Sequence, residues 1–244
     1  AGRPRLSLTS ATPGARIDLV PAELVNGTSV DQRTTGAPIW DTLVPDAGQT
    51  EWSPETVYHG GRVLEVSGLA PHEPDSSVSF EVMRVDNERV GGFSSSDEFL
   101  SRLHTIIDRA VQSNMYSVFT DCPHREKLGW LADMIQSMGA IHSDFDVSAY
   151  MRGMQRQMLE SQQPGGLIPG TAPEFPNFGG GYRDDVNWGG AFILTLYELW
   201  KTYGDTHTMR EYYPHMQDYL AYVRAQVSGG LLTVDGAMAA TATL

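Results

Sequence analysis

The hydrophobic period of the chain changes at Gly91-Gly92, and this change limits the architectures that the chain can adopt. Before it, short runs alternate apolar and polar residues, which is the period of a half-buried β-strand. After it, apolar residues recur at three- and four-residue spacing, which is the period of an amphipathic helix. The sequence therefore predicts a mainly α protein, with a β-sandwich segment over residues 1–90 and a helical segment over residues 91–244.

Strand patterns of the first segment include residues 15–20, 63–67 and 78–83. Turn signals that contain glycine or proline, such as Asn26-Gly27 and the run 45–48, separate these patterns. The segment is short for a complete β-sandwich, so we expect a partial one.

The second segment is predicted to be a series of helices with no strand between them. The expected helices cover residues 99–111, 131–141, 147–160, 190–203 and 207–226. Ser96 or Asp97 is the candidate N-cap of the first helix, and Pro214 predicts a kink or a restart in the last. Methionines at near-helical spacing between Met134 and Met158 are expected in the core. Consecutive helices of this kind predict helical hairpins.

The formal net charge of the chain is -13, and 41% of its residues are hydrophobic. This charge disfavours binding to nucleic acid or to anionic lipid through bulk electrostatics. The sequence has no run of about 18 apolar residues, so we expect no membrane span. We expect a soluble protein, and its composition suits the cytoplasm and secretion alike.

A single cysteine, Cys122, excludes an internal disulfide and a cysteine-rich metal site. His124 has no second histidine at metal-binding spacing, so a structural hydrogen bond is the expected role of its ring. No acidic loop has the spacing of a calcium site. We therefore expect no metal and no cofactor.

Residues 121–130, with the sequence DCPHREKLGW, form the segment richest in chemistry, and we call it the decamer. Pro123 and Gly129 forbid one regular helix through it. Its chemically active side chains are Asp121, Arg125, Glu126 and Trp130. Carboxylates bind hydroxyls or move protons, a guanidinium fixes a carboxylate or a hydroxyl, and an indole stacks on a sugar ring. The decamer therefore predicts a site that cleaves sugars.

A long loop rich in glycine and proline covers residues 165–181, and acids and aromatics continue to Trp188. Loops of this length inside compact domains tend to be functional. The candidate hydroxyl partners are Glu174, Tyr182, Asp184 and Asp185. Small neighbours, Gly189 and Gly190, are expected to leave a face of the Trp188 indole open to a sugar. A solvated crossover for the loop, and core packing for Trp130 and Trp188, are the alternatives.

Taken together, these segments resemble a bacterial α-L-rhamnosidase of glycoside hydrolase family 78. The decamer is similar to the family signature Asp-Cys-Pro-Gln-Arg-Asp-Glu-Arg-Leu-Gly-Trp with one residue fewer, and the gap fits on either side of Arg125. Residues 187–191 resemble the family segment Trp-Gly-Asp-Ala, with Gly190 where aspartate is usual. Residues 58–68 look like the strand that closes the β-sandwich ahead of the catalytic domain. The resemblance implies part of an (α/α)6 barrel of helical hairpins behind a partial β-sandwich.

The resemblance also implies an inverting glycosidase that releases terminal α-linked L-rhamnose from a rhamnosylated glycoside or polysaccharide. Glu126 would be the general acid. The substrate-binding residues would be Asp121, Arg125, Trp130, Asp133 and Trp188, with Glu174 and Asp185 from the loop. In the family the catalytic base is a glutamate further downstream, beyond Leu244. We therefore expect a truncated N-terminal part of the catalytic region that is inactive in isolation.

The general acid of such an enzyme must be protonated near neutral pH. Arg125 and Lys127 beside Glu126 favour the charged carboxylate, whereas Asp121 and Asp133 favour the protonated form. The sequence does not decide between these influences. A surface carboxylate in a salt-bridged turn is the alternative for Glu126, and a turn-capping side chain is the alternative for Asp121.

Two other functions fit the same residues. A polysaccharide lyase of similar helical-barrel fold would cleave rhamnose linked to a uronic acid by β-elimination, and it would need basic side chains around the substrate carboxylate. A non-catalytic carbohydrate-binding fragment would keep Trp130 and Trp188 but would not depend on a protonated Glu126.

Overall fold

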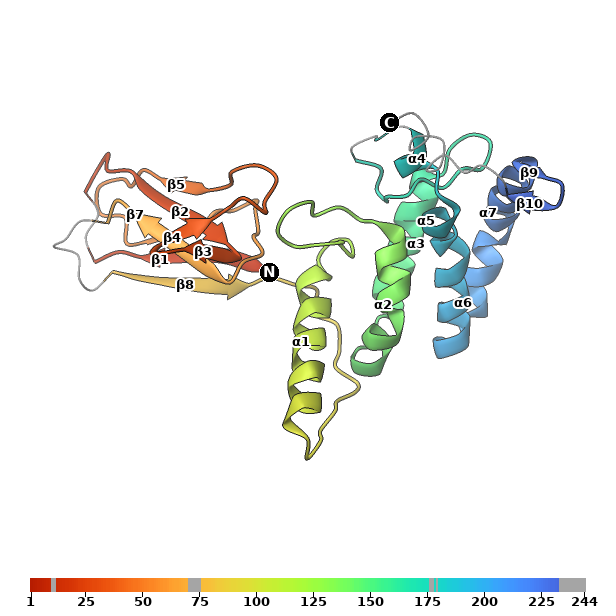
Figure 1. Cartoon of the computed structure of the whole chain (residues 1–244), viewed down its shortest axis with the longest axis horizontal. Helices are drawn as coiled ribbons and strands as arrows, with labels where there is room; N and C mark the ends of the chain where they lie inside the picture. Colours follow the sequence, from red (N-terminus) through yellow and green to blue (C-terminus); the bar gives the residue numbers. More distant parts are fainter. Residues whose placement is uncertain (10–11, 70–75, 176–177, 179, 233–244) are drawn as a thin grey trace. The chain divides into compact units, whose positions relative to one another are not determined.

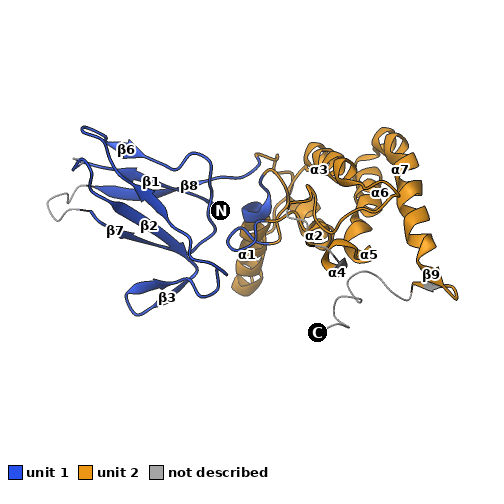
Figure 2. Cartoon of the chain, turned by 90° about the horizontal axis from the view of Figure 1, so that it is seen from above, with its two compact units in different colours: residues 1–85, 112–116, 122–127 blue, residues 86–111, 117–121, 128–244 orange. Residues whose placement is uncertain are grey.

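The computed structural model describes residues 1–9, 12–69, 76–175, 178 and 180–232. The chain forms two compact units (Figure 2). We call residues 1–85, 112–116 and 122–127 the β unit, and residues 86–111, 117–121 and 128–244 the helical unit. The decamer is therefore divided, because its central residues 122–127 belong to the β unit and its two ends to the helical unit.

Small antiparallel sheets build the β unit (Figure 1). One sheet has the order β6-β1-β8, with β6 (Glu51–Trp52), β1 (Gly2–Ser7) and β8 (Ser77–Val82). A second has the order β5-β2-β7, with β5 (Asp41–Leu43), β2 (Ile17–Ala22) and β7 (Val63–Ser67). A hairpin of β3 (Leu24–Asn26) and β4 (Ser29–Asp31) turns at Gly27, whose φ of 65° suits glycine.

The two three-stranded sheets share one hydrophobic core. Leu6 on β1 and Leu19 on β2 are fully buried, whereas Arg5, the neighbour of Leu6, is exposed, as the alternation of a strand requires. Trp52 and Leu64 pack against this core from β6 and β7. The strands expected from the sequence are confirmed, and β7 has the expected bounds.

Among its described residues, the helical unit contains five long helices and two short ones. The long ones are α1 (Glu98–Asn114), whose last residues belong to the β unit, α2 (Leu131–Asp144), α3 (Ser148–Ser161), α6 (Ala191–Tyr203) and α7 (Thr206–Ala225). The short ones are α4 (Gly180–Arg183) and α5 (Val186–Gly189), and a hairpin of β9 (Val227–Ser228) and β10 (Leu231–Leu232) follows α7. The five expected helices are confirmed, and α4 begins inside the segment expected to be loop.

Helix α6 packs against α2, α3 and α7, and α6 and α7 run side by side (Figure 1). Phe192 and Leu196 of α6 are fully buried, as are Met154 and Met158 of α3, so the methionines are core residues as expected. Gly204 ends α6 with a φ of 66°. Helix α7 continues through Pro214, so it does not restart there.

Helix α1 leaves much of its apolar face exposed. Its exposed large apolar side chains are Phe99, Leu100, Leu103, Ile106 and Ile107. No helix in the described part of the chain is both long enough and apolar enough to cross a membrane.

Candidate functional site

The centre of the decamer is a tight turn held against the β unit. The Gly60 N–H donates to the Pro123 carbonyl at 2.8 Å, and the Lys127 Nζ donates to the Tyr58 carbonyl at 2.6 Å. Lys127 has a φ of 56°, in the left-handed region that few non-glycine residues adopt. Burial lowers the pKa of the Lys127 amine below its ordinary value. The turn that presents the acid candidate is thus fixed by backbone contacts on both of its sides.

Glu126 lies on this turn, and 33% of its side chain is exposed. Its Oε1 accepts a hydrogen bond of 2.6 Å from Nη2 of Arg125, whose side chain is 55% exposed. A guanidinium at this distance favours the charged form of a carboxylate. Without a ligand, the turn therefore has the geometry of the salt-bridged alternative, and the acid role of Glu126 stays a prediction.

Asp121, which belongs to the helical unit, forms the hydrogen bonds that close the decamer turn. Its Oδ1 accepts from the Leu128 N–H at 3.1 Å, and its own N–H donates to the Leu128 carbonyl at 3.1 Å. These two bonds join the ends of the turn, so the capping alternative is confirmed for one oxygen of this carboxylate. Asp133 lies half-buried in the first turn of α2, where the helix dipole favours a negative charge.

Trp130 is held at the start of α2 by pairing with the segment 170–172. The Leu131 N–H donates to the Gly170 carbonyl at 3.0 Å, and the Ala172 N–H donates to the Gly129 carbonyl at 3.0 Å. A Cβ at Gly129 would lie 2.3 Å from the Ala172 carbonyl oxygen, so only glycine permits this approach. Backbone hydrogen bonds therefore hold the loop after α3 against the segment that contains the decamer's tryptophan.

An aromatic cluster surrounds Trp130. The Phe178 ring stacks on the indole with centroids 5.3 Å apart, and the Trp188 ring meets it edge-on at 6.3 Å. The Tyr182 ring lies 6.5 Å from that of Phe178. The two tryptophans predicted from the sequence are thus brought together, and such a cluster offers apolar ring faces to the C–H groups of a sugar.

Trp188 is placed by the short helix α5. Asp185 caps this helix, since its Oδ1 accepts from the Asn187 N–H at 2.8 Å and from the Asn187 Nδ2 at 2.9 Å. A Cβ at Gly189 would lie 2.8 Å from the Tyr219 Oη, so this glycine is needed for close packing, a reason other than the open indole face that we expected. The Trp188 Nε1 is buried and has no hydrogen-bond partner among the described residues.

Glu174 forms the most connected ion pair of the loop. Its carboxylate accepts from both Nε and Nη2 of Arg183, the latter at 3.0 Å, and from Gln163 Nε2 at 3.4 Å. The side chains of Glu174 and Arg183 are 14% and 24% exposed. A bidentate pair of this kind fixes the geometry of the segment between its partners.

The neighbouring Asp184 anchors the same loop to α7, because its carboxylate accepts a hydrogen bond from the Tyr222 Oη. Burial, together with this bond, raises the pKa of Tyr222 to about 12. Sequence reasoning missed Phe178 and Tyr222, and it did not pair Arg183 with Glu174. Arg183 lies within the acidic loop and was a visible partner for Glu174, whereas nothing in the local pattern connects Tyr222 with Asp184.

The predicted site residues are distributed over both units. Arg125 and Glu126 belong to the β unit, and the other predicted residues belong to the helical unit. In the described part of the chain, no group of three or more His, Cys, Asp and Glu side chains is arranged to hold a metal ion.

Residues 88–239 match the family model of the bacterial α-L-rhamnosidase six-hairpin glycosidase domain. The chain belongs to this family. An α-L-rhamnosidase of Formosa agariphila is 28% identical over 86% of the chain, and one of Streptomyces avermitilis is 26% identical over 93%. The chain spans only 24% and 22% of the lengths of these two curated relatives.

Solved rhamnosidase structures have the same fold. The Streptomyces avermitilis α-L-rhamnosidase complexed with L-rhamnose has a TM-score of 0.85 and 27% identity, over 96% of this chain and 23% of that one. The α-L-rhamnosidase of Dictyoglumus thermophilum has a TM-score of 0.84 and 24% identity, over 96% of this chain and 26% of that one. The helices and small antiparallel sheets described above are therefore an arrangement that solved rhamnosidases share.

Proposed function

We propose that this rhamnosidase-family chain carries the acid and part of the sugar pocket of an inverting glycosidase that releases terminal α-linked L-rhamnose from a rhamnosylated glycoside or polysaccharide. The observation that carries the proposal is the aromatic cluster of Trp130 and Trp188, built onto the decamer that contains Glu126. Both tryptophans lie within residues 88–239, which match the family model, and this supports the proposal.

Inversion uses two carboxyl groups roughly 6.5–9.5 Å apart, with the scissile bond and a water between them. In our proposal, Glu126 gives its proton to the departing glycosidic oxygen as the bond from the anomeric carbon to that oxygen breaks. Water attacks the anomeric carbon from the opposite face and gives its proton to a second carboxylate. We assign this base to none of the described residues, so we expect residues 1–244 alone to bind L-rhamnose without measurable hydrolysis.

Arg125 has to release Glu126 for this step. While the ion pair is intact, the guanidinium favours the charged form of the carboxylate, which has no proton to give. We propose that a sugar hydroxyl takes the place of Glu126 on the guanidinium. Loss of the cation beside it would raise the pKa of Glu126, so that the carboxylate could take up a proton from solvent before the sugar is cleaved. Arg125 would then be both a sugar ligand and a control on the protonation of Glu126.

The remaining predicted residues divide into two groups. Trp130 and Trp188 would stack on the apolar face of the sugar, while Asp121 and Asp133 would accept its hydroxyl hydrogens. Glu174 and Asp185 already accept hydrogen bonds from Arg183 and Asn187. We propose that these two carboxylates contribute to substrate binding chiefly by fixing the loop that carries the aromatic cluster.

The proposal includes the architecture. We assign residues 1–90 to an accessory β-sandwich and residues 91–244 to part of an (α/α)6 barrel. The exposed apolar face of α1 supports this assignment, because an amphipathic barrel helix buries such a face against neighbouring hairpins.

Titration calorimetry of the 244-residue chain with L-rhamnose tests the proposal. We expect saturable binding that is lost in Trp130→Ala and retained in Glu126→Gln, because the second variant keeps the shape of the acid. Absence of binding by the unsubstituted chain would overturn the proposal. A product that absorbs in the ultraviolet, released from a rhamnosyl-uronate polymer, would favour the lyase.

A further inference from the structure

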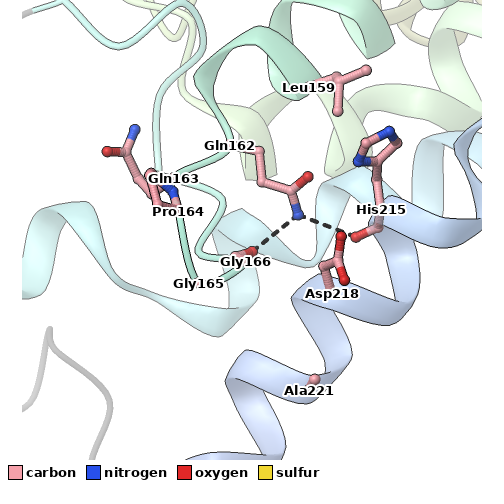
Figure 3. A pocket seen from close by; sticks show the side chains of 9 residues that line it. All are labelled: Leu159, Gln162, Gln163, Pro164, Gly165, Gly166, His215, Asp218 and Ala221. Carbon is pink, nitrogen blue, oxygen red and sulfur yellow. Dashed lines mark hydrogen bonds between the residues drawn. The ribbon is translucent and has the colours of Figure 1, made fainter.

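A groove lies between the C-terminal end of α3 and the middle of α7, within the helical unit (Figure 3). We call it the α3–α7 groove. Its volume is about 570 Å³, within the range of small-molecule sites. The turn 164–166 closes one end, and Gly166 approaches α7 so closely that a Cβ there would lie 2.3 Å from the Asp218 carbonyl oxygen.

One wall of the groove carries a carboxamide with a fixed orientation. Gln162 Nε2 donates to the Gly166 carbonyl and to the His215 carbonyl, both at 3.1 Å. Both of its N–H groups are therefore used, and the oxygen is the remaining polar atom. Figure 3 shows this Oε1 turned toward the side of the groove where the His215 ring lies.

The other wall is one face of α7. His215, Asp218 and Ala221 follow each other at three-residue spacing and so share that face. The carboxylate of Asp218 can only accept hydrogen bonds, and a neutral imidazole offers one acceptor nitrogen. Ala221 leaves space for a ligand, and Leu159 adds an apolar surface from α3.

The polar and apolar side chains of the groove together favour a ligand with hydroxyl groups and an apolar face. The acceptor atoms of Gln162, His215 and Asp218 favour a ligand with several hydrogen-bond donors, and the imidazole N–H can also donate to such a ligand. The apolar surfaces of Leu159 and Ala221 suit C–H groups between those donors. An anion is disfavoured by Asp218 and by the net charge of -13. A saccharide ring, with hydroxyls around an apolar face, meets each condition.

We propose that the α3–α7 groove is a second carbohydrate site, which binds a further sugar unit of a rhamnosylated oligosaccharide. Gln163 also lines the groove and donates to Glu174, so the groove adjoins the loop that carries the aromatic cluster. The inference rests on the proposed function for the kind of sugar, but the groove itself stands on its own geometry.

The test uses the ¹⁵N-labelled chain, titrated with a trisaccharide that ends in α-L-rhamnose and followed by NMR. The amides of Gly165 and Gly166 report on the groove, and the indole N–H signals of Trp130 and Trp188 report on the aromatic cluster. We expect both sets of signals to shift. In Ala221→Trp the new ring fills the groove, so the glycine shifts should disappear while the indole shifts remain.

The matched control is Ala149→Trp, which adds the same side chain at an exposed position of α3 and should keep both sets of shifts. Asp218→Asn should weaken the binding that the glycine shifts report by only a few-fold, because the amide oxygen of asparagine still accepts a hydrogen bond from a hydroxyl. The inference is overturned if the glycine amides of the unsubstituted chain do not respond, or if they respond equally in Ala221→Trp. Glycine shifts without indole shifts would support the sugar site in the groove and contradict the proposed function. Indole shifts without glycine shifts would support the proposed function and contradict the sugar site in the groove.

Discussion

Two Arg–Glu pairs of the candidate site differ in almost every physical respect. Arg183 and Glu174 form a bidentate pair with 24% and 14% side-chain exposure, reinforced by Gln163. Arg125 and Glu126 are adjacent residues on a turn, joined by a hydrogen bond of 2.6 Å, and their side chains are 55% and 33% exposed. The first pair is suited to holding a loop and the second to being broken by a ligand. Burial therefore distinguishes the carboxylate that we propose to be structural from the one that we propose to react.

The largest effect is expected from the buried pair. Arg183→Met should lower the free energy of unfolding by about 3 kcal/mol, because it leaves the Glu174 carboxylate poorly solvated and without its main partner. Denaturant unfolding measures this. The double variant Arg183→Met/Glu174→Leu should recover part of the loss, since no unpaired charge remains. Equal stability of the single variant and the unsubstituted chain would show that the pair does not hold the loop.

Removal of the stacking ring should be next in size. Trp130→Ala should weaken L-rhamnose binding by about tenfold or more, to below what calorimetry detects, because the indole face and its contacts with Phe178 and Trp188 are lost together. Trp130→Phe, which keeps a flat ring, should retain part of the affinity. Calorimetry of the three proteins distinguishes a sugar platform from plain core packing, because core packing would change stability without changing affinity.

The decamer turn itself should respond more modestly. Asp121→Ala removes the acceptor of the Leu128 N–H and should lower the free energy of unfolding by about 1 kcal/mol. Asp121→Asn keeps an acceptor oxygen and should restore most of that stability. Were both variants equally destabilised, the negative charge and not the hydrogen bond would be what closes the turn.

The hydrogen bond that anchors the loop on α7 predicts that the stability of the protein falls at alkaline pH. The pKa of Tyr222 is raised to about 12, by burial and by the bond to Asp184, so the native state keeps its proton after the unfolded chain has lost it. This contribution to stability is complete below the ordinary tyrosine pKa of about 10 and disappears as the pH rises through 12. Unfolding measured between these pH values should show a smaller loss of stability in Tyr222→Phe.

The smallest effect is expected from the exposed pair. Arg125→Gln should change the free energy of unfolding by less than about 0.5 kcal/mol, as is usual for exposed ion pairs. Its affinity for L-rhamnose should nevertheless fall, because Arg125 is proposed to bind a hydroxyl. A stability loss comparable to that of Arg183→Met would remove the distinction between the two pairs.

Local periodicity was enough to predict the strands and the long helices. The alternation at residues 63–67 gave β7 its bounds, and the apolar spacing on α6 matched its burial against α2, α3 and α7. Each pattern shows which face of an element is buried against its neighbours, and this information lies within the sequence of that element alone.

The sequence could not predict the partners of the loop acids, since those depend on tertiary contacts. Asp184 meets Tyr222, and the stacking of Phe178 on Trp130 joins two segments separated by α2 and α3. The helical spacing of α7 placed Tyr222 on a helix but did not indicate that its hydroxyl meets the loop. Arg183 was a visible partner for Glu174, but the bidentate geometry of the pair depends on the folded loop.

We propose that L-rhamnose binds at the aromatic cluster, which contains the decamer residue Trp130. The most direct test of this proposal is the tryptophan indole N–H spectrum of the ¹⁵N-labelled chain during a titration with L-rhamnose. We expect saturable shifts of the Trp130 and Trp188 signals, and no detectable binding in Trp130→Ala. Indole signals that stay unchanged at saturating sugar would contradict the proposal.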